Sequence, residues 1–271
     1  FAKDSKTLGD DLFVFILEDT TTGKTRGTCQ IMSQTGTQLP FYSYRLGRIT
    51  QHSKELDRTF RAEMLTLTTD LDGSSEVGGL YLDRSRYLFM RAHRARFADR
   101  TLAELRGAID DAGNSPFWDG LAGRFFDMNF RDADEFNARM GNQFIADLMP
   151  KHPIYTALLS EAARQVMGQP HFSGRPAMRM LESEGFSYQN YIDIFDGGPS
   201  MVVETDRIRT IVEAQDAPVV GIAQTTASDD CLIAVGRLAD FHACLGTLAH
   251  TDEGVIINAE AAKLLGINVG D

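Results

Sequence analysis

The sequence is poor in cysteine and in long apolar runs, and each shortage argues against a class of protein. Among its 271 residues there are three cysteines, Cys29, Cys231 and Cys244, and no two of them form a CxxC pair. An odd number without such a pair argues against a disulfide framework and indicates reduced thiols. No apolar run approaches the ~20 residues that a membrane-spanning helix needs. We therefore expect a cytoplasmic protein with no membrane partner.

Positive charge is also in short supply. Lysine and arginine together number 27 against 38 aspartate and glutamate residues, which gives a formal net charge of −11. Such an acidic chain is not expected to bind nucleic acid, although it is compatible with a cationic substrate. The metal-binding pattern HxxxH and Cys/His clusters are missing as well, and so are GxGxxG and P-loop motifs. The sequence therefore predicts no metal site and no permanently bound cofactor.

What the sequence does contain is a series of short strand and helix patterns. Alternating apolar residues predict strands in the first 83 residues, and a helical period begins at Arg84. The segment "SPFWDGLAGRFFDMNF" predicts a helix from Pro116 to about Gly123, followed by an aromatic strand. "RPAMRMLESEGFSYQNYIDIFD" again reads as a helix, a glycine and an aromatic strand, so a degenerate internal repeat is expected. The predicted strands are residues 12–17, 27–32, 40–53, 64–70, 75–83 and 101–110.

The chain changes character after the turn Asp196-Gly197-Gly198-Pro199. Beyond about Asp216 only short strands are predicted, over residues 218–222, 231–235 and 254–257. We therefore expect two domains, an α+β region over residues 1–205 and a small β-rich part over residues 206–271.

Several segments of the sequence resemble those of a known family. "FVFILEDTTTGKTRGT", "FYSYRLGRITQHSKEL", "MPKHPIY" and "YIDIFDGGP" look like arginine N-succinyltransferases, which belong to the GNAT acyltransferase superfamily. The resemblance runs from about Leu12 to Pro199 and continues more weakly to Asp271. It implies a GNAT-like fold, with a mixed, mostly antiparallel sheet, flanking helices and a degenerate second half. It also implies that the chain is an enzyme of arginine catabolism.

The stretch "LYLDRSRYLFM" passes from a strand to a helix at Asp83–Arg84 without a connecting turn. Family members carry a proline-, arginine- and glycine-rich loop at this point, which cradles the pyrophosphate of coenzyme A beside a helix N-terminus. We therefore expect a longer gene product, with residues before Phe1 and between Asp83 and Arg84 that the sequence does not include. A genuine deletion of the loop is the less favoured alternative.

The resemblance also implies roles for individual residues. In GNAT folds a bulged strand holds the thioester, and Gly78-Gly79-Leu80 matches that strand, with Leu80 at the family's succinyl-CoA contact. Paired glycines inside a strand favour the same interpretation, because they mark a bulge or a close approach of another backbone. His171, in "GQPHFSG", matches the family's proton donor.

The other candidates rest on residue type. Among the remaining histidines, His152 is a candidate substrate contact and His52 stands at a possible helix start, whereas the rest are expected at the surface: His93, His242 and His250. Carboxylates suit a guanidinium, and the candidates are Glu76, Asp193 and Asp196. For each of them a solvated or turn-capping position is the favoured interpretation. The arginines of residues 84–100 are expected to form a solvated helix face rather than a phosphate site.

The implied reaction moves succinyl from succinyl-CoA, as a co-substrate, to the α-amino group of L-arginine. Ornithine is the alternative substrate, and a non-catalytic subunit of a hetero-oligomeric succinyltransferase is the alternative role. A homo-oligomer or a hetero-oligomer with a paralogous subunit is expected.

Overall fold

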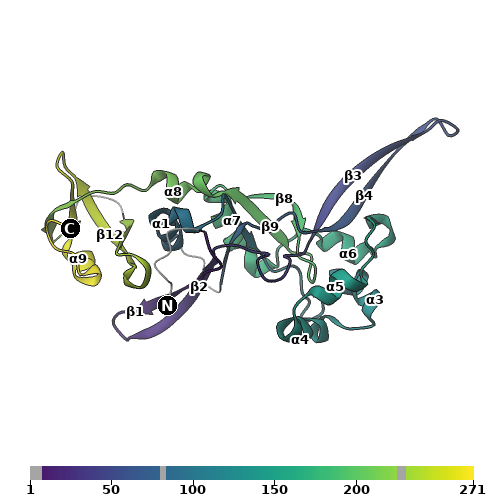
Figure 1. Ribbon diagram of the computed structural model, residues 1–271, viewed down its shortest axis with the longest axis horizontal. Helices are drawn as coiled ribbons and strands as arrows, with labels where there is room; N and C mark the ends of the chain where they lie inside the picture. Colours follow the sequence, from purple (N-terminus) through teal and green to yellow (C-terminus); the bar gives the residue numbers. More distant parts are fainter. Residues whose placement is uncertain (1–7, 80–83, 225–229) are drawn as a thin grey trace.

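A computed structural model describes residues 8–79, 84–224 and 230–271. It shows an elongated molecule with two sheets, and a long hairpin projects from the end opposite the C-terminus (Figure 1). The larger sheet has nine strands in the order β1-β2-β5-β6-β9-β8-β3-β4-β7. Its strands are β1 (Leu12–Asp19), β2 (Lys24–Met32), β3 (Ser43–Ser53), β4 (Arg58–Thr68), β5 (Ser75–Gly78), β6 (Arg100–Glu104), β7 (Ile154–Tyr155), β8 (Ser187–Ile192) and β9 (Pro199–Glu204).

Every pair of neighbouring strands in this sheet is antiparallel except β5 and β6, which run parallel. The expected mixed, mostly antiparallel sheet is therefore confirmed. Its centre joins segments that are far apart in sequence, because β6 pairs with β9 from Arg100↔Glu204 to Glu104↔Ser200. The chain thus brings the end of β6 next to the turn that precedes β9.

The helices cover the sheet in two groups. The segments that flank its two halves are α1 (Ser85–Ala92), α2 (Pro116–Gly120), α3 (Gly123–Phe126), α4 (Phe130–Met140), α5 (Gln143–Leu148), α6 (Glu161–Val166), α7 (Arg175–Ser183) and α8 (Arg209–Glu213). One apolar core joins α1 and α7 to β1, β2, β5, β6 and β9, and a second joins α2, α4, α5 and α6 to β3, β4 and β8. Trp118 is fully buried in the second core, between Phe126 and Phe195.

Alternation along β6 separates two environments. Ala103 and Leu105 point into the helix-covered core, whereas Leu102 packs with Tyr191 on the opposite face. Because successive side chains of a strand point to opposite faces, Glu104 shares the face of Leu102. The functional site described below lies on that face.

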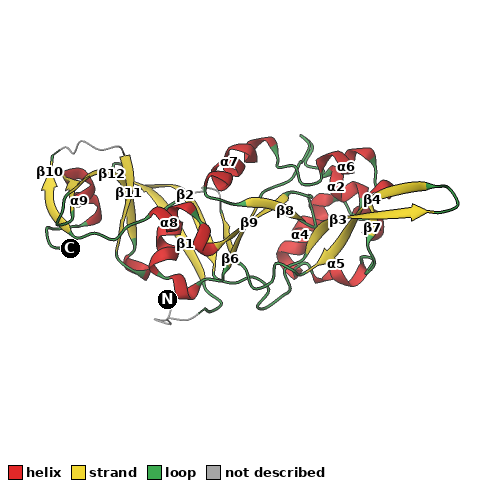
Figure 2. Cartoon of the chain, turned by 90° about the horizontal axis from the view of Figure 1, so that it is seen from above, coloured by secondary structure: helices red, strands yellow, loops and turns green. Residues whose placement is uncertain are grey.

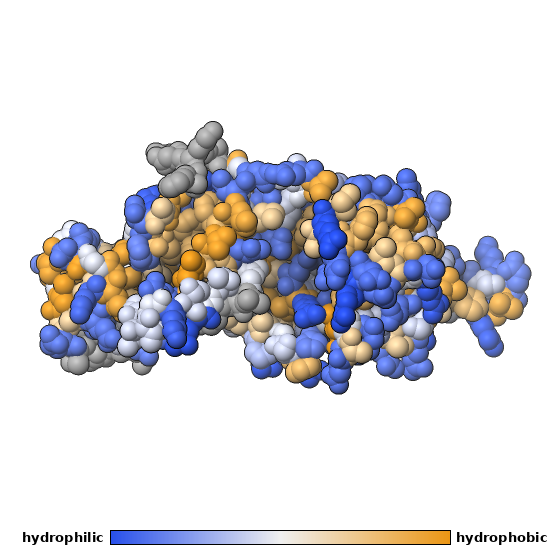
Figure 3. All heavy atoms as spheres, turned by 90° about the horizontal axis from the view of Figure 1, so that it is seen from below, coloured by the Kyte–Doolittle hydropathy of each residue, from blue (hydrophilic) through white to orange (hydrophobic). Residues whose placement is uncertain are grey.

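The C-terminal part forms a four-stranded sheet in the order β10-β13-β12-β11. Its elements are β10 (Val219–Ala223), β11 (Asp230–Val235), β12 (His242–His250), β13 (Val255–Asn258) and α9 (Ala259–Leu265). The small sheet and α9 lie at one end of the molecule, and the β3–β4 hairpin extends beyond the other (Figure 2). On the side of the molecule seen in Figure 3, apolar side chains gather over the C-terminal part, whereas the β3–β4 hairpin is mostly polar.

Three of the predicted strands of this part are confirmed, and β12 and α9 were not predicted. The division into residues 1–205 and 206–271 stays a proposal. Ile208, just beyond the proposed boundary, is fully buried in the core of the large sheet.

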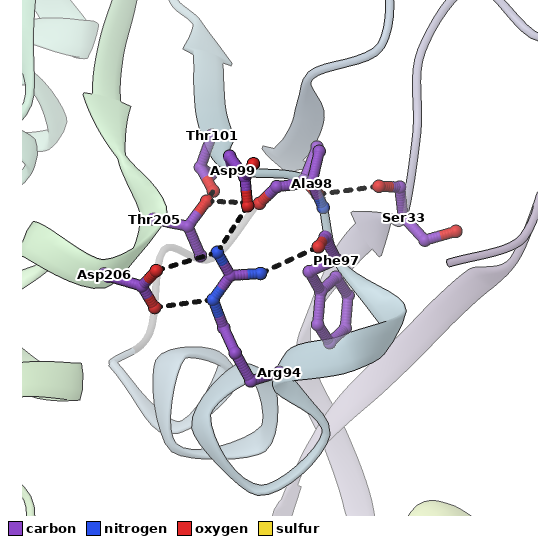
Figure 4. Close-up of polar contacts among 9 residues, drawn as sticks. Ser33, Arg94, Phe97, Ala98, Asp99, Thr101, Thr205 and Asp206 are labelled. Carbon is purple, nitrogen blue, oxygen red and sulfur yellow. Dashed lines mark hydrogen bonds and ion pairs between the residues drawn. The ribbon is translucent and has the colours of Figure 1, made fainter. Parts of the chain in front are cut away.

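An arginine clamp joins the short helix η1 (Arg94–Arg96) to the segment after β9. The Arg94 guanidinium forms ion pairs with Asp206 at 2.6 Å and Asp99 at 2.9 Å, and it donates to the Phe97 carbonyl at 2.8 Å (Figure 4). Thr205 reinforces the same junction by donating to the Ala98 carbonyl. The arginine run is therefore partly structural.

The structure corrects several local predictions. The aromatic segment after Gly123 is not a strand, because α3 and then the start of α4 occupy it. Its aromatic rings pack on Trp118 and on one another, and this tertiary packing overrides their strand propensity. The likeness between the two helix-glycine segments therefore stops at the glycine.

Two predictions of exposure are also wrong. Arg86 and Arg96 are buried, with 0% and 3% exposure, rather than on a solvated face. His93 is 6% exposed, because its ring lies between Phe89 and the segment that leads to β12. His52 does not begin a helix but lies near the end of β3 in the projecting hairpin.

Candidate active site

The parallel strands β5 and β6 diverge soon after they meet. Among the residues that the structure describes, their pairing consists of Ser75↔Thr101 and Glu76↔Leu102, so Val77 and Gly78 lie beyond the paired part of β5. Gly79 follows β5 with a φ of +118°, a conformation that side chains rarely adopt. A Cβ there would lie 2.7 Å from Cys29 Cα, so the close approach to β2 also requires glycine.

The loop that carries His171 is fastened to the end of β6. The His171 N–H donates to the Arg106 carbonyl at 2.7 Å, and Gly107 forms an isolated antiparallel bridge with Pro170. The same loop is also tied to the turn before β9, because the Gly168 N–H donates to the Gly197 carbonyl at 2.8 Å. Three segments that are distant in sequence therefore meet at one point.

Two glycines let these segments approach each other. A Cβ on Gly107 would lie 2.7 Å from both Asp196 Oδ1 and Gly198 N, and a Cβ on Gly198 would overlap the Leu105 carbonyl. The turn therefore packs backbone to backbone on the end of β6. Its shape is set by Asp193, whose Oδ1 accepts from the Phe195 and Asp196 N–H groups at 2.7 Å.

A cavity of about 480 Å³ opens where β6, the turn and α4 converge. Carboxylates dominate its polar lining, and one arginine is the exception. The lining residues are Glu104, Leu105, Arg106, Phe130, Asp134, Asn137, Asp193, Phe195 and Asp196. Phe130, Asp134 and Asn137 come from α4, at a spacing that puts them on one side of the helix.

Burial and repulsion by neighbouring carboxylates raise the pKa of two carboxyls of this cavity, Glu104 and Asp193. Burial, followed by the neighbouring Asp196 carboxylate, raises the pKa of Asp193 to about 8. Burial also raises the pKa of Glu104 well above its usual range, and Asp193 and Glu76 add to the effect. Because Arg106 is the one cationic side chain among the lining residues, a cationic ligand beside these carboxyls would be favoured.

The imidazole of His171 is held by its neighbour Ser173. The ring Nδ1 lies 2.7 Å from Ser173 Oγ and 3.4 Å from the Ser173 N–H. Because a backbone N–H can only donate, this contact makes Nδ1 an acceptor and assigns the proton of the neutral ring to Nε2. In the imidazolium form, the proton on Nε2 can pass to a leaving group, while Nδ1–H can donate to Ser173 Oγ.

Some of the predicted site residues come together and others do not. His171 stands beside the cavity through the backbone of Arg106, and Asp193 and Asp196 line the cavity while also capping their turn. Gly78 and Gly79 lie at the end of β5, and Leu80 falls outside the described residues. Glu76 does not line the cavity, although its charge acts on Glu104. The exposed histidines, His152, His242 and His250, also do not line it.

Sequence reasoning missed Glu104, Arg106 and Asp134. The signal for the first two was present in "TLAELRGA", where two charged residues interrupt an apolar strand pattern. Asp134 carried no comparable signal, because a carboxylate on an amphipathic helix is ordinarily solvated.

Within the described ranges, no three or more His, Cys, Asp or Glu side chains are grouped to hold a metal ion. No helix among these residues combines the length and apolar character required to cross a bilayer.

The mixed sheet, with a parallel pair that diverges beside a glycine in the left-handed region, defines a GNAT-like acyltransferase. Comparison with known proteins places the chain within that class. The family described as "Arginine N-succinyltransferase beta subunit" matches residues 1–210, and the family's C-terminal domain matches residues 215–271. The chain belongs to the arginine N-succinyltransferase beta subunit family, as the resemblance in its sequence indicated.

Curated relatives agree with this assignment. "Arginine N-succinyltransferase" of Escherichia coli (strain 55989 / EAEC) is 41% identical over 276 residues, which cover 96% of this chain and 79% of the relative. The protein of the same name from Enterobacter sp. (strain 638) is 41% identical over 280 residues, with the same coverage.

A solved structure, arginine/ornithine succinyltransferase subunit AI from Pseudomonas aeruginosa, is similar throughout. It is 33% identical with a TM-score of 0.84, and the match covers 97% of this chain and 80% of that one.

Proposed function

We propose that the protein transfers succinyl from succinyl-CoA to the α-amino group of L-arginine, giving N2-succinyl-L-arginine and coenzyme A, in the catabolism of arginine. The observation that carries the proposal is the acidic cavity beside His171, at the end of diverging strands. A cavity rich in carboxylates suits a cationic amino acid. The names of the curated relatives support arginine as that amino acid.

The α-nitrogen must lose two protons, one before attack and one as the amide forms, and the departing sulfur must gain one. The α-ammonium group must lose a proton before its lone pair attacks the thioester carbonyl, and Asp193, with a pKa of about 8, is suited to accept it. Attack forms the C–N bond and a tetrahedral oxyanion. The nitrogen of that intermediate loses its second proton to solvent, and collapse of the intermediate breaks the C–S bond. His171 then protonates the departing thiolate through Nε2.

Succinyl-CoA is a co-substrate in this proposal rather than a permanently bound cofactor. Gly78, Gly79 and Leu80 would hold its thioester at the end of β5. The diverging strands fit that role, because the β5–β6 pairing stops after two residue pairs. A Cβ on Gly78 would meet the Gln30 side chain at 3.8 Å, an ordinary van der Waals contact.

Assaying the full-length chain with succinyl-CoA and a panel of amines tests the proposal. We expect release of the coenzyme A thiol with L-arginine, a slower reaction with L-ornithine and none with Nα-acetyl-L-arginine, whose α-amine is blocked. Mass spectrometry of the product should place the succinyl group on the α-nitrogen. Faster turnover of ornithine would support the alternative substrate.

A chain that is inactive alone but active after addition of a paralogous subunit would support the role of a non-catalytic partner. The family's chemistry is favoured here because the described residues include both the acidic cavity and His171. Light scattering of the full-length chain would show whether it forms the proposed homo-oligomer.

A cytoplasmic location is also proposed. Cys231 and Cys244 are free cysteines. Reduced thiols of this kind are typical of the cytoplasm.

A further inference from the structure

The cavity has an unbalanced set of charges. Four of its lining residues are carboxylic acids, namely Glu104, Asp134, Asp193 and Asp196, and Arg106 is the only cationic side chain among the lining residues. An acyl group that ends in a carboxylate would be repelled by such a surface. A single arginine therefore determines whether an anionic acyl group can enter.

Arg106 has no protein partner for its charge among the described residues. No ion pair or side-chain hydrogen bond is formed by its guanidinium there, and the side chain is exposed. The other arginines around β6 differ. Arg94, Arg96 and Arg84 each hold a carboxylate within 2.9 Å. The guanidinium of Arg106 is thus available to a ligand.

The position of Arg106 is nevertheless well defined. Its carbonyl accepts the His171 N–H at 2.7 Å, and the next residue, Gly107, bridges to Pro170. Arg106 lies two residues beyond Glu104, the last residue of β6, and both side chains line the cavity. Its guanidinium therefore extends from the point where the loop of His171 meets β6.

Arg86 is the other cation near the end of β5, and its surroundings differ. It is fully buried, it is not among the cavity lining residues, and its guanidinium contacts the Gly78 carbonyl at 3.4 Å and Tyr87 Oη at 3.5 Å. A rigid, enclosed side chain of this kind supports the backbone rather than a mobile acyl chain.

We propose that Arg106 binds the terminal carboxylate of the acyl group and so selects dicarboxylic acyl thioesters over neutral ones. The assignment rests on the proposed function, because it concerns the acyl donor of that reaction. The planar guanidinium presents two parallel N–H donors, which match the two oxygens of a carboxylate. Lysine would supply charge without that bidentate geometry.

Steady-state kinetics with two acyl donors test the assignment. Succinyl-CoA and butyryl-CoA carry four-carbon acyl groups, and the carboxylate is present only in the first. We expect Arg106→Met to lower kcat/KM for succinyl-CoA about 10²-fold, as for loss of a charged contact, and to leave or raise that for butyryl-CoA. Arg106→Lys should fall between Arg106→Met and the wild type. Arg58→Met, on the projecting hairpin, is the matched control and should keep the wild-type ratio.

The outcomes separate the two proposals. If the wild type transfers no succinyl group, the proposed function itself fails. If the wild type is active and Arg106→Met keeps the wild-type ratio of the two donors, only the assignment of Arg106 is overturned. A melting temperature close to that of the wild type shows that the variant is folded, and Arg106→Lys provides a second, more conservative variant.

Discussion

At the scale of single residues, the site combines carboxyl groups with raised pKa values and a histidine with a defined orientation. Glu104 and Asp193 retain protons because burial and neighbouring carboxylates disfavour their charged forms. His171 is oriented by Ser173 so that its free nitrogen carries a proton. Asp193 is therefore a base only in its ionised form, in which it can take a proton from an amine, while His171 can give one to a thiolate.

Replacing His171 tests the donor role. We expect His171→Ala to lower kcat by about 10²–10⁴-fold, which is the usual value of acid–base assistance, with little change in the affinity for succinyl-CoA. The exposed His250, on β12, is the matched control, and His250→Ala should behave as the wild type. Turnover by His171→Ala at the wild-type rate would show that the proton comes from another group.

Asp193 should make stability depend on pH. Its pKa is 3.8 in the unfolded chain and about 8 in the folded protein. Its contribution to the free energy of unfolding is therefore fully present below pH 3.8. That stability is lost as the pH rises through about 8. Asp193→Asn keeps an oxygen for the Phe195 and Asp196 N–H groups but cannot ionise. Its melting temperature should therefore fall less than that of the wild type between about pH 5 and about pH 9, by several degrees.

Thermal melts across that range, with the exposed Asp252→Asn as control, measure the difference. Parallel pH dependence of the wild type and Asp193→Asn would contradict the raised pKa.

At the scale of elements, the sequence predicted strands better than it predicted their arrangement. Apolar alternation located β1, β3 and β4, because each strand has a period of two that is visible locally. The sheet order depends on pairings such as β6 with β9, which join segments about a hundred residues apart and leave no local trace. The cavity shares this dependence, since Glu104 and Asp193 become neighbours only through that pairing. His171 was predicted because the segment "GQPHFSG" resembles the family's sequence, and not because of its surroundings.

The glycine after β5 should be essential to its element. Gly79→Ala would place a Cβ 2.7 Å from Cys29 Cα in a backbone conformation with φ of +118°. We expect a loss of about 1–3 kcal/mol in the free energy of unfolding, measured by denaturant titration. Gly47→Ala in β3, where a Cβ meets nothing within 4 Å, is the control and should change little. Equal stability of the two variants would rule out strain at Gly79.

At the scale of the whole molecule, the two sheets are joined through α1. Phe241 packs against Phe15 and Phe89 with ring centroids 6.0 and 5.2 Å apart, and the Leu238 N–H donates to His93 Nε2 at 3.3 Å. Arg91 adds an ion pair with Asp216 at 2.8 Å. The small sheet is thus attached by an aromatic contact with polar support.

Truncating the aromatic contact should loosen the attachment selectively. We expect Phe241→Ala to increase hydrogen exchange in α1 and at the start of β12, because both lose packing there, while exchange in β3 and β4 stays unchanged. Phe60→Ala is the control, since Phe60 is 47% exposed in the projecting hairpin. Uniformly increased exchange throughout the chain would show global destabilisation instead.

The backbone ties among β6, the loop of His171 and the turn before β9 have a consequence for redesign. Because the Gly168 and His171 N–H groups fasten that loop to Gly197 and Arg106, any change in the turn would also displace the proton donor. The α4 wall of the cavity lacks those two ties. An engineer who wishes to alter the accepted amine should therefore vary Asp134 and Asn137 first, because that wall can change shape while the acid keeps its place.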